Sequence, residues 1–207
     1  LIASLFLPPK TKQMTEQELQ DQNDHLMFMQ SIEEECAIDI NKKIEHPPVA
    51  ISFKTKEVST KDGLKSFPVP IGTYGNFSFV QAPPKSMKTF FVSLLGSAFC
   101  YPNGSHTKGM DSFRDNKHFV HFDTEQGEWH AQRVFKRLQW MNFAENLDFY
   151  HTFALRKISY RSRIDFIEYY LECMREEGKD IGLVVIDGVA DLVSDVNNLE
   201  ESSAIVQ

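Results

Sequence analysis

Residues 82–89, with the sequence Ala-Pro-Pro-Lys-Ser-Met-Lys-Thr, have the spacing of a loop that binds phosphate. The pattern GxxxxGK followed by Ser or Thr supplies backbone amides, a lysine for the β and γ phosphates, and a hydroxyl that holds magnesium. Lys88 and Thr89 match the end of this pattern, but Ala82 and Met87 replace both of its glycines. Glycine is preferred where the backbone takes a positive φ or comes close to a phosphate, so this segment alone indicates nucleotide binding only weakly.

Two acidic residues follow apolar segments that we expect to be strands. Glu125 comes two residues after the segment 118–123, and Asp187 directly follows the segment 181–186. Carboxylates at the carboxyl ends of parallel strands lie in the crevice where ligands bind in open α/β sheets. There Glu125 can orient an attacking water, and Asp187 can hold magnesium through water. Either acid alone is explained as well by a solvated strand end or a helix cap. The segment 82–89, Glu125 and Asp187, occurring together in this order, favour a nucleotide site.

These sites need strands and helices in alternation to position them, and the chain has that pattern from residue 76 onward. We expect strands at 76–80, 118–123, 147–155 and 181–186, helices at 89–99, 128–146 and 161–177, and a surface loop at 100–117. The alternation predicts an α/β fold with a central, mainly parallel sheet flanked by helices. The strand at 181–186 is the most apolar, so we expect it to be central and buried on both faces.

The segment before this core is predicted to be helical and to lie outside the α/β domain. Thr15 and Glu18 form a capping box, and apolar residues follow at helical spacing, so residues 1–46 are predicted to be an N-terminal helical arm. We expect this arm to serve in docking or oligomer contacts. Residues 47–207 would then form the core domain, which begins with a short strand at 49–53 and a loop rich in Lys, Asp and Gly.

Composition excludes several classes of protein. Hydrophobic residues make up 42% and charged residues 25% of the chain, which is typical of a globular protein and not of a disordered one. The net charge of -7 argues against coating of nucleic acid through bulk charge, although a local basic patch stays possible. No apolar run approaches the roughly 18 residues needed to span a membrane. The three widely spaced cysteines are expected to be reduced thiols, so we expect a cytoplasmic protein without a membrane span.

Other candidate groups are less informative. His118 and His121 are three residues apart on a predicted strand, so they point to opposite faces and are not expected to share a metal. Two basic clusters are expected to be solvated faces, with contacts to DNA or to the nucleotide of a neighbouring subunit as the alternative. They comprise Arg133, Lys136 and Arg137, and Arg156, Lys157, Arg161 and Arg163.

The chain resembles RecA-type P-loop ATPases, in the subgroup near the hexameric replicative helicases of the plasmid RepA kind. It is most similar to the AAA-family ATPases encoded by Bacteroidota genomes, phages and mobile elements. The resemblance covers about residues 47–207 and is specific in its combination of motifs. The segments that carry it are 75–78, 85–89, 122–126, 129–135, 149–156 and 186–195, with Asn197 and Asn198.

The resemblance implies a RecA-like P-loop core that binds ATP and Mg²⁺. Lys88 would contact the phosphates, Thr89 and Asp187 would hold magnesium, and Glu125 would activate water, so Lys88 and Glu125 are the expected catalytic residues. The residues expected to line the nucleotide site are Ala82, Pro83, Pro84, Lys85, Ser86, Met87, Lys88 and Thr89. Gly188 stands where RecA proteins often carry a polar sensor. Asp191 and Asp195 are further candidates for the site or simple caps. A core of this type needs at least one more strand after Asp187, so its C-terminal strands are expected to be missing here.

Three functions follow as expectations. The first is an ATP-binding and ATP-hydrolysing module that acts in replication or mobilisation of DNA, with DNA as a partner and with a homo-oligomer, such as a hexamer, as its assembly. The second is a nucleotide-responsive interaction module with little or no hydrolysis, which the loss of both loop glycines motivates. A DNA-binding protein with a vestigial nucleotide site is a third and weaker possibility.

Overall fold

The computed structural model describes residues 15–83, 85–101, 107 and 109–194. Pro84 and Asp195, both candidates for the nucleotide site, and the segment 195–207 lie outside the described residues. The chain divides into two compact units, residues 1–46 and 47–207. No helix among the described residues is both long and apolar enough to cross a membrane.

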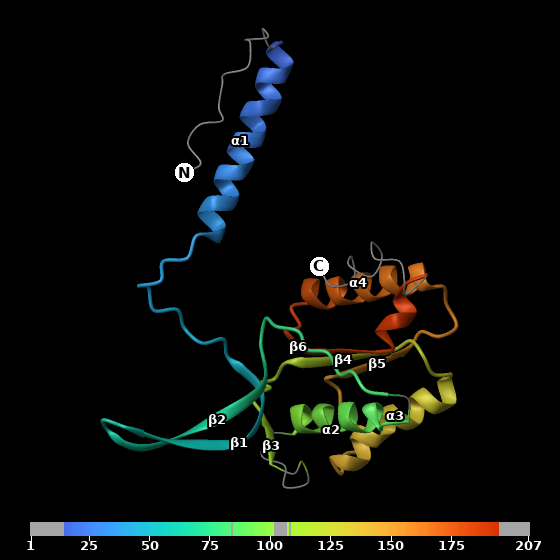
Figure 1. The fold of residues 1–207 in the computed structure, drawn as a ribbon. Helices are drawn as coiled ribbons and strands as arrows, with labels where there is room; N and C mark the ends of the chain where they lie inside the picture. The colour runs from blue at the N-terminus through green and yellow to red at the C-terminus, as the bar shows by residue number, and fades with distance from the viewer. Residues whose placement is uncertain (1–14, 84, 102–106, 108, 195–207) are drawn as a thin grey trace. The chain divides into compact units, whose positions relative to one another are not determined.

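The first unit is built on the helix α1 (Glu16–Cys36), which is drawn in blue in Figure 1. The predicted capping box is confirmed, because the Thr15 hydroxyl accepts from the amide of Glu18 while the Glu18 carboxylate accepts from the amide of Thr15. None of the residues of α1 is buried. Its apolar side chains, among them Leu26 and Phe28, are therefore left exposed on the described part of the chain.

A three-stranded parallel sheet forms the centre of the second unit. Its strands are β4 (His118–Asp123), β5 (Tyr150–Ala154) and β6 (Ile181–Asp187), in the order β5-β4-β6. In register, Asp123 at the end of β4 lies opposite Ala154 on one side and Asp187 on the other. The three strands thus end together at one edge of the sheet, which brings two acidic residues next to each other.

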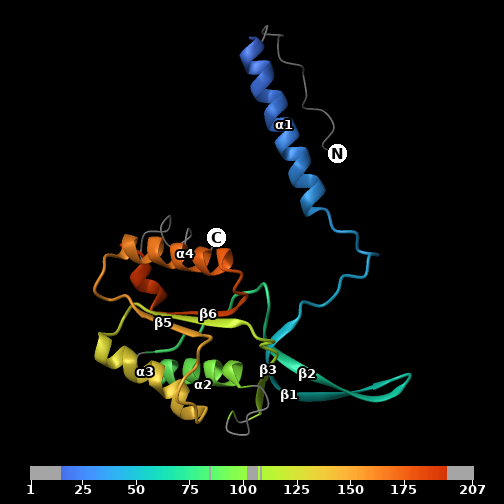
Figure 2. The same ribbon diagram turned by 180° about the vertical axis from the view of Figure 1, so that it is seen from behind.

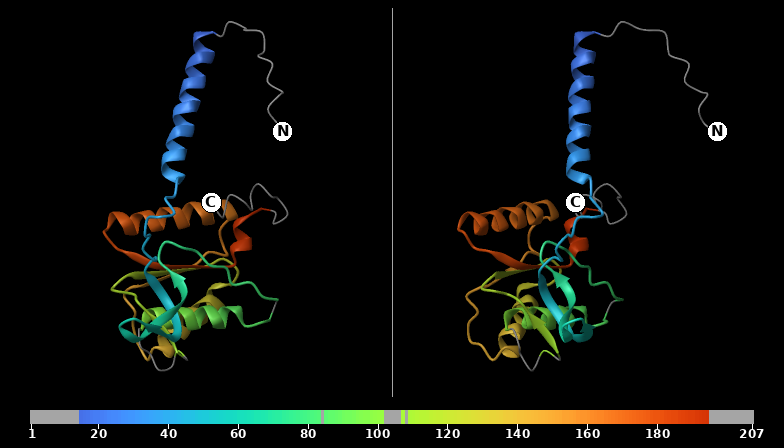
Figure 3. Two further views of the ribbon diagram at one scale, coloured as in Figure 1. Left: turned by 60° about the vertical axis from the view of Figure 1, so that its left-hand side comes forward. Right: turned by 90° about the vertical axis from the view of Figure 1, so that its left-hand side faces the viewer.

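Helices cover both faces of this sheet, as Figures 1 and 3 show. On one face lie α2 (Lys88–Cys100) and α3 (Glu128–Met141), which bury Phe99 and Leu138 against Phe119 of β4. On the other face lie α4 (Tyr160–Glu176) and the short 3-10 helix η2 (Val189–Leu192). Apolar residues at helical spacing predict one buried face for the helix at 161–177, and this is confirmed, because they pack against β4 and β5 in this second core; they are Ile164, Ile167, Tyr170, Leu171 and Met174.

A second, antiparallel sheet comprises β1 (Val49–Thr60), β2 (Gly63–Thr73) and β3 (Met110–Ser112), in the order β2-β1-β3. The long β1–β2 hairpin is seen best in Figure 2. The prediction of a loop after residue 53 was therefore wrong, since β1 continues to Thr60 and pairs with β2. In the sequence, Pro68 and Pro70 predict a break in regular structure, but they lie on an edge strand, where a missing N–H is tolerated. The prediction of a loop over residues 100–117 was also wrong in part, because β3 lies within this range.

Three other expectations are corrected. Residues 76–80 were predicted to be a strand but have no regular structure, and Phe77 is 73% exposed. Consequently β6 has β4 on one side only and is an edge strand of the described sheet, not the central, doubly buried one. The helix predicted to reach residue 146 ends at Met141, because the Asn142 side chain donates to the Leu138 carbonyl and Phe143 takes a positive φ of 53°.

The contact between α2 and the sheet depends on a glycine. A Cβ added at Gly96 would lie 2.8 Å from Cε1 of Phe119 and 2.9 Å from Cδ2 of Leu138, both fully buried. We expect Gly96→Ala to lower the free energy of unfolding by about 1–3 kcal/mol, because this core has no room for another methyl group. Urea denaturation would measure the loss. Gly72→Ala is the matched control, since nothing lies within 4 Å of its Cβ position, and an equal loss in both variants would contradict the packing argument.

Candidate functional site

The predicted phosphate loop leads directly into α2. Lys85 and Met87 both have left-handed backbone conformations, with φ values of 64° and 65°. Met87 therefore adopts the conformation for which the usual glycine is preferred. Its side chain is 72% exposed, so it projects into solvent and does not crowd the described part of the loop. The strain of a positive φ at a residue with a side chain is the kind that clusters at ligand sites.

The N-terminus of α2 has backbone amides available for an anion. Met87 is the residue before the helix, and no side chain among the described residues caps it. The first amides of a helix have no partner within the helix, and they carry the positive end of its dipole. A phosphate or another anion is the ligand that such an end binds.

Lys88 lies at the start of α2 and is exposed. Its Nζ donates a hydrogen bond to the carbonyl oxygen of Ala82, at 3.0 Å, so the side chain folds back across the loop. The loop is also braced by Ser86, whose hydroxyl donates to the carbonyl of Pro83 at 2.6 Å. These contacts keep the ammonium group of Lys88 beside the residues that the sequence assigns to phosphate binding.

Thr89 and Asp187 are 98 residues apart in sequence and meet at this site. The Thr89 hydroxyl donates to Oδ2 of Asp187 at 3.2 Å and thereby links α2 to the end of β6. A hydroxyl and a carboxylate are oxygen ligands of the kind that magnesium takes. The structure thus brings together the two residues that the sequence assigns to the metal.

Glu125 and its neighbours follow the end of β4. The Glu125 side chain is exposed, and it makes no hydrogen bond or ion pair within the described residues. Thr124 anchors the same turn to β6, because its amide donates to the carbonyl of Asp187 at 3.0 Å and its hydroxyl lies 2.7 Å from the carbonyl of Gly188. Glu125 is therefore carried on a fixed backbone beside Asp187.

Asp123 is a residue of this site that sequence reasoning did not select. Its side chain is fully buried, and Oδ1 accepts from the amides of Glu125 and Gln126 at 3.1 and 2.8 Å. Burial raises the pKa of the Asp123 carboxyl, the amide of Gln126 lowers it, and the neighbouring Asp187 raises it further. Its place as the last residue of β4, in register with Asp187, was the signal that could have identified it.

Gly188 directly follows the magnesium candidate and has a φ of 101°. A Cβ at this position would lie 2.5 Å from the Thr124 hydroxyl, so a larger residue would displace the turn. Space and backbone conformation thus both favour glycine at this position. Asp191 lies nearby, with a carboxylate oxygen 3.4 Å from the Thr124 hydroxyl.

The histidines of β4 point to opposite faces, as predicted. His118 bonds to His151 through their ring nitrogens at 3.0 Å, whereas His121 bonds to the hydroxyl of Tyr150 at 2.9 Å on the α3 side. Within the described residues there is no group of three or more His, Cys, Asp or Glu that could hold a metal by itself. A metal at Thr89 and Asp187 would therefore need ligands from elsewhere, such as phosphate oxygens and water.

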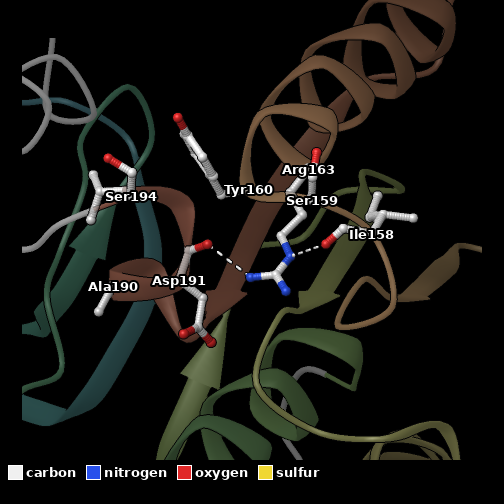
Figure 4. Close-up of a pocket in the computed structure, with 8 residues that line it drawn as sticks. Ile158, Ser159, Tyr160, Arg163, Ala190, Asp191 and Ser194 are labelled. Carbon is white, nitrogen blue, oxygen red and sulfur yellow. Dashed lines mark hydrogen bonds between the residues drawn. The ribbon is translucent and has the colours of Figure 1, made fainter.

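The two basic clusters include arginines with structural contacts. Arg137 stacks over the ring of Phe90 at 3.8 Å and donates to the Ser93 hydroxyl. Arg163 donates to the carbonyls of Ile158 and Asp191, at 3.1 and 2.8 Å, and ties α4 to η2 (Figure 4). It lines an open pocket of about 580 Å³ beside the start of α4. Of the candidate site residues that pocket is lined by Asp191, but not by Lys88, Thr89 or Asp187, so we do not assign it to the nucleotide.

Acid is expected to destabilise the fold through His121. Burial lowers the pKa of this histidine to about 3 from 6.5. Between about pH 3 and pH 6.5, His121 therefore carries a proton in the unfolded chain but not in the folded chain. Stability from this residue is present above about pH 6.5 and falls as the pH decreases toward 3. Between pH 7 and pH 5 we expect a loss of about 2 kcal/mol in the free energy of unfolding.

Urea denaturation at both pH values, on wild type and on His121→Phe, measures this effect. Phenylalanine keeps a ring between Phe119 and Phe135 but does not titrate. The difference in the free energy of unfolding between pH 7 and pH 5 should be about 2 kcal/mol smaller in the variant than in wild type. An unchanged difference would contradict this assignment.

Comparison with known proteins finds no matching family model, no matching curated protein and no matching solved structure. The chemistry open to this chain therefore follows from the geometry around Thr89, Asp187 and Asp123.

Proposed function

We propose that residues 47–207 form a RecA-like P-loop core that binds ATP with Mg²⁺ and hydrolyses it. The observation that carries this proposal is the 3.2 Å hydrogen bond between the Thr89 hydroxyl and the Asp187 carboxylate. It joins the residue after the loop lysine to the acid at the end of a parallel strand. In P-loop enzymes the loop Ser or Thr and a strand-end Asp hold magnesium together.

The loop and the N-terminus of α2 support the proposal that this site binds the phosphates of ATP. The helix has 13 residues and starts at Lys88, with no side-chain cap among the described residues. Its free amides and dipole favour an anion at this end. Lys88 adds a formal positive charge, which is held beside the loop by its bond to the Ala82 carbonyl. Ala82, Pro83, Lys85, Ser86 and Met87 would then surround the phosphates, mainly through the backbone.

The residues present also fit magnesium. This ion is usually held by one or two carboxylates together with substrate phosphates and several waters. Thr89 and Asp187 supply one hydroxyl and one carboxylate at a shared point, which suffices when a nucleotide provides further oxygens. When bound, the ion would neutralise charge that develops on the phosphates.

Hydrolysis is assigned to Glu125. Catalysis of phosphoryl transfer is mainly positioning and electrostatic stabilisation, with one residue that orients the attacking water. Glu125 is exposed at the same edge of the sheet as Asp187, on a turn whose backbone is anchored by Asp123 and Thr124. Its carboxylate can accept the proton of a water, while Lys88 stabilises charge on the transferred group.

For the wider role we propose replication or mobilisation of DNA by a homo-oligomer, such as a hexamer, as the family resemblance implies. The net charge of -7 indicates that contact with DNA would be local. Arg133 is a suitable contact, because it is exposed on α3, where it stacks over Trp129.

A second candidate is a nucleotide-responsive interaction module with little or no hydrolysis. The observation that favours it is α1, whose residues are all exposed although Leu26, Met27 and Phe28 are large and apolar. A helix of this kind is suited to contact a partner. Steady phosphate release from ATP separates the two candidates, because only the first requires turnover.

Titration of the whole chain with ATP tests the proposed function. We expect saturable binding in the presence of Mg²⁺ and weaker binding with a chelator, because the metal bridges the phosphates and Asp187. Binding that is absent under both conditions would overturn the proposal. Binding that does not change on chelation would overturn the magnesium assignment.

A further inference from the structure

Asp123 has two carboxylate oxygens in different surroundings. Its side chain has 0% exposure and lies at the end of β4, the central strand of the parallel sheet. The neighbouring strand places Asp187 directly opposite in register. Thr89 bonds to Asp187, so Asp123 is adjacent to the proposed magnesium site without being one of its assigned ligands.

The first oxygen, Oδ1, holds the turn that carries Glu125. It accepts from the amide of Glu125 at 3.1 Å and from the amide of Gln126 at 2.8 Å. Hydrogen bonds to a charged acceptor are stronger than those between neutral groups. Loss of this acceptor would free the backbone of the residue proposed to orient the water, while the Thr124 contacts to β6 would remain.

The second oxygen, Oδ2, is buried and has no hydrogen-bond partner among the described residues. Burying a polar oxygen without a partner is costly, so such an atom in a native structure calls for an explanation. The adjacent site explains it, because Mg²⁺ usually keeps several bound waters and these are hydrogen-bond donors. Groups that bond to the ligands of a metal, and not to the metal, commonly tune its affinity.

We propose that Asp123 is a positioning residue with two tasks, an inference that rests on the proposed function. Oδ1 fixes the backbone of Glu125, and Oδ2 accepts a hydrogen bond from a water on the magnesium ion. The two oxygens thereby couple the position of the water-activating residue to occupancy of the metal site.

Two substitutions separate these tasks. Asp123→Asn keeps an acceptor for the amides of Glu125 and Gln126 but replaces the second oxygen with a donor. Asp123→Ala removes both groups. Asp165→Asn, which removes an exposed carboxylate on α4, is the matched control. Hydrogen exchange of the ligand-free protein should show faster exchange at Glu125 and Gln126 in the alanine variant only.

Binding and turnover report on the second task. We expect ATP affinity without Mg²⁺ to be retained in both variants. The Mg²⁺ concentration for half-maximal ATP binding should rise about tenfold in both, as for loss of a group that orients a metal ligand. The kcat should fall about 10²-fold in Asp123→Ala, where the position of Glu125 is also lost. Asp165→Asn should match wild type in every assay.

A separate result would contradict each of the two roles of Asp123. Unchanged exchange at Glu125 and Gln126 in Asp123→Ala would overturn the role of Oδ1. An unchanged Mg²⁺ requirement in Asp123→Asn would overturn the role of Oδ2, and this isosteric variant answers that question even if the alanine variant does not fold. If wild type binds no ATP, the proposed function and the role of Oδ2 both fail. The exchange measurement in the ligand-free protein still decides the role of Oδ1.

Discussion

Replacing Lys88 with alanine is expected to weaken ATP binding about 10²-fold, because a contact between two charged groups contributes about 2–3 kcal/mol. Lys88 is the cationic side chain at the start of α2, and its ammonium group is held beside the loop by the Ala82 carbonyl. The amides of the loop and the helix dipole remain in the variant, so binding should be weakened and not abolished. Isothermal titration calorimetry with Mg²⁺-ATP measures the change.

The control for this experiment is a lysine away from the site. Lys61 is exposed in the turn between β1 and β2, and Lys61→Ala removes the same charge from the chain. We expect it to bind ATP like wild type. Thermal unfolding of all three proteins checks that the fold is retained, since Lys88 also braces the loop. Equal affinity of Lys88→Ala and wild type would show that the phosphates are bound elsewhere.

Replacing Glu125 with glutamine is expected to reduce ATP turnover by about 10²–10⁴-fold while ATP binding stays near the wild-type value. Glutamine keeps the size of the side chain but cannot accept a proton from the attacking water. The backbone bond from Glu125 to Asp123 does not involve the side chain, so the turn should be unchanged. Steady-state phosphate release and a binding titration on the same preparation measure both quantities.

Glu128→Gln is the matched control for this loss of charge. Glu128 is the first residue of α3 and is exposed, with an ion pair to Lys157 at 2.7 Å. Exposed ion pairs of this kind contribute little, so turnover should stay at the wild-type level. If Glu125→Gln also keeps full turnover, another group activates the water. If wild type itself releases no phosphate, the interaction module with little hydrolysis is the better description.

Local sequence signals predicted α4 and the strands of the parallel sheet well. The stripe on α4 and the alternation of strands with helices each reflect burial on a regular period, which short segments encode by themselves. Gly178 follows the end of α4 and has a φ of 72°, the left-handed conformation in which glycine commonly ends a helix. The strands β4, β5 and β6 were also predicted, and with them the edge at which Asp187 lies.

Tertiary arrangement was predicted less well. The β1–β2 hairpin was missed because Pro68 and Pro70 signal a break unless the strand is known to be an edge. The apolar composition of β6 indicated a central strand, but residues 76–80 do not pair beside it, so it lies at an edge of the sheet that the described residues form. Neither outcome depends on local propensity, since both depend on which strands become neighbours.

Local sequence signals were also insufficient to identify every residue of the site. Lys88, Thr89, Glu125 and Asp187 were selected from motifs, and the structure adds the contact between Thr89 and Asp187. Asp123 was passed over because an acid at a strand end is ordinary in sequence. Its place at the end of β4 is a weak signal, and its complete burial and the lack of a hydrogen-bond partner for Oδ2 among the described residues are properties of the folded chain.

A crystal structure of the chain with Mg²⁺ and a non-hydrolysable ATP analogue tests the magnesium nucleotide site most directly. We predict density for the phosphates at the start of α2, with Lys88 turned from the Ala82 carbonyl toward them. The magnesium ion should lie between the phosphates and the pair formed by Thr89 and Asp187. A nucleotide bound elsewhere, for example in the pocket beside Arg163, would contradict the assignment.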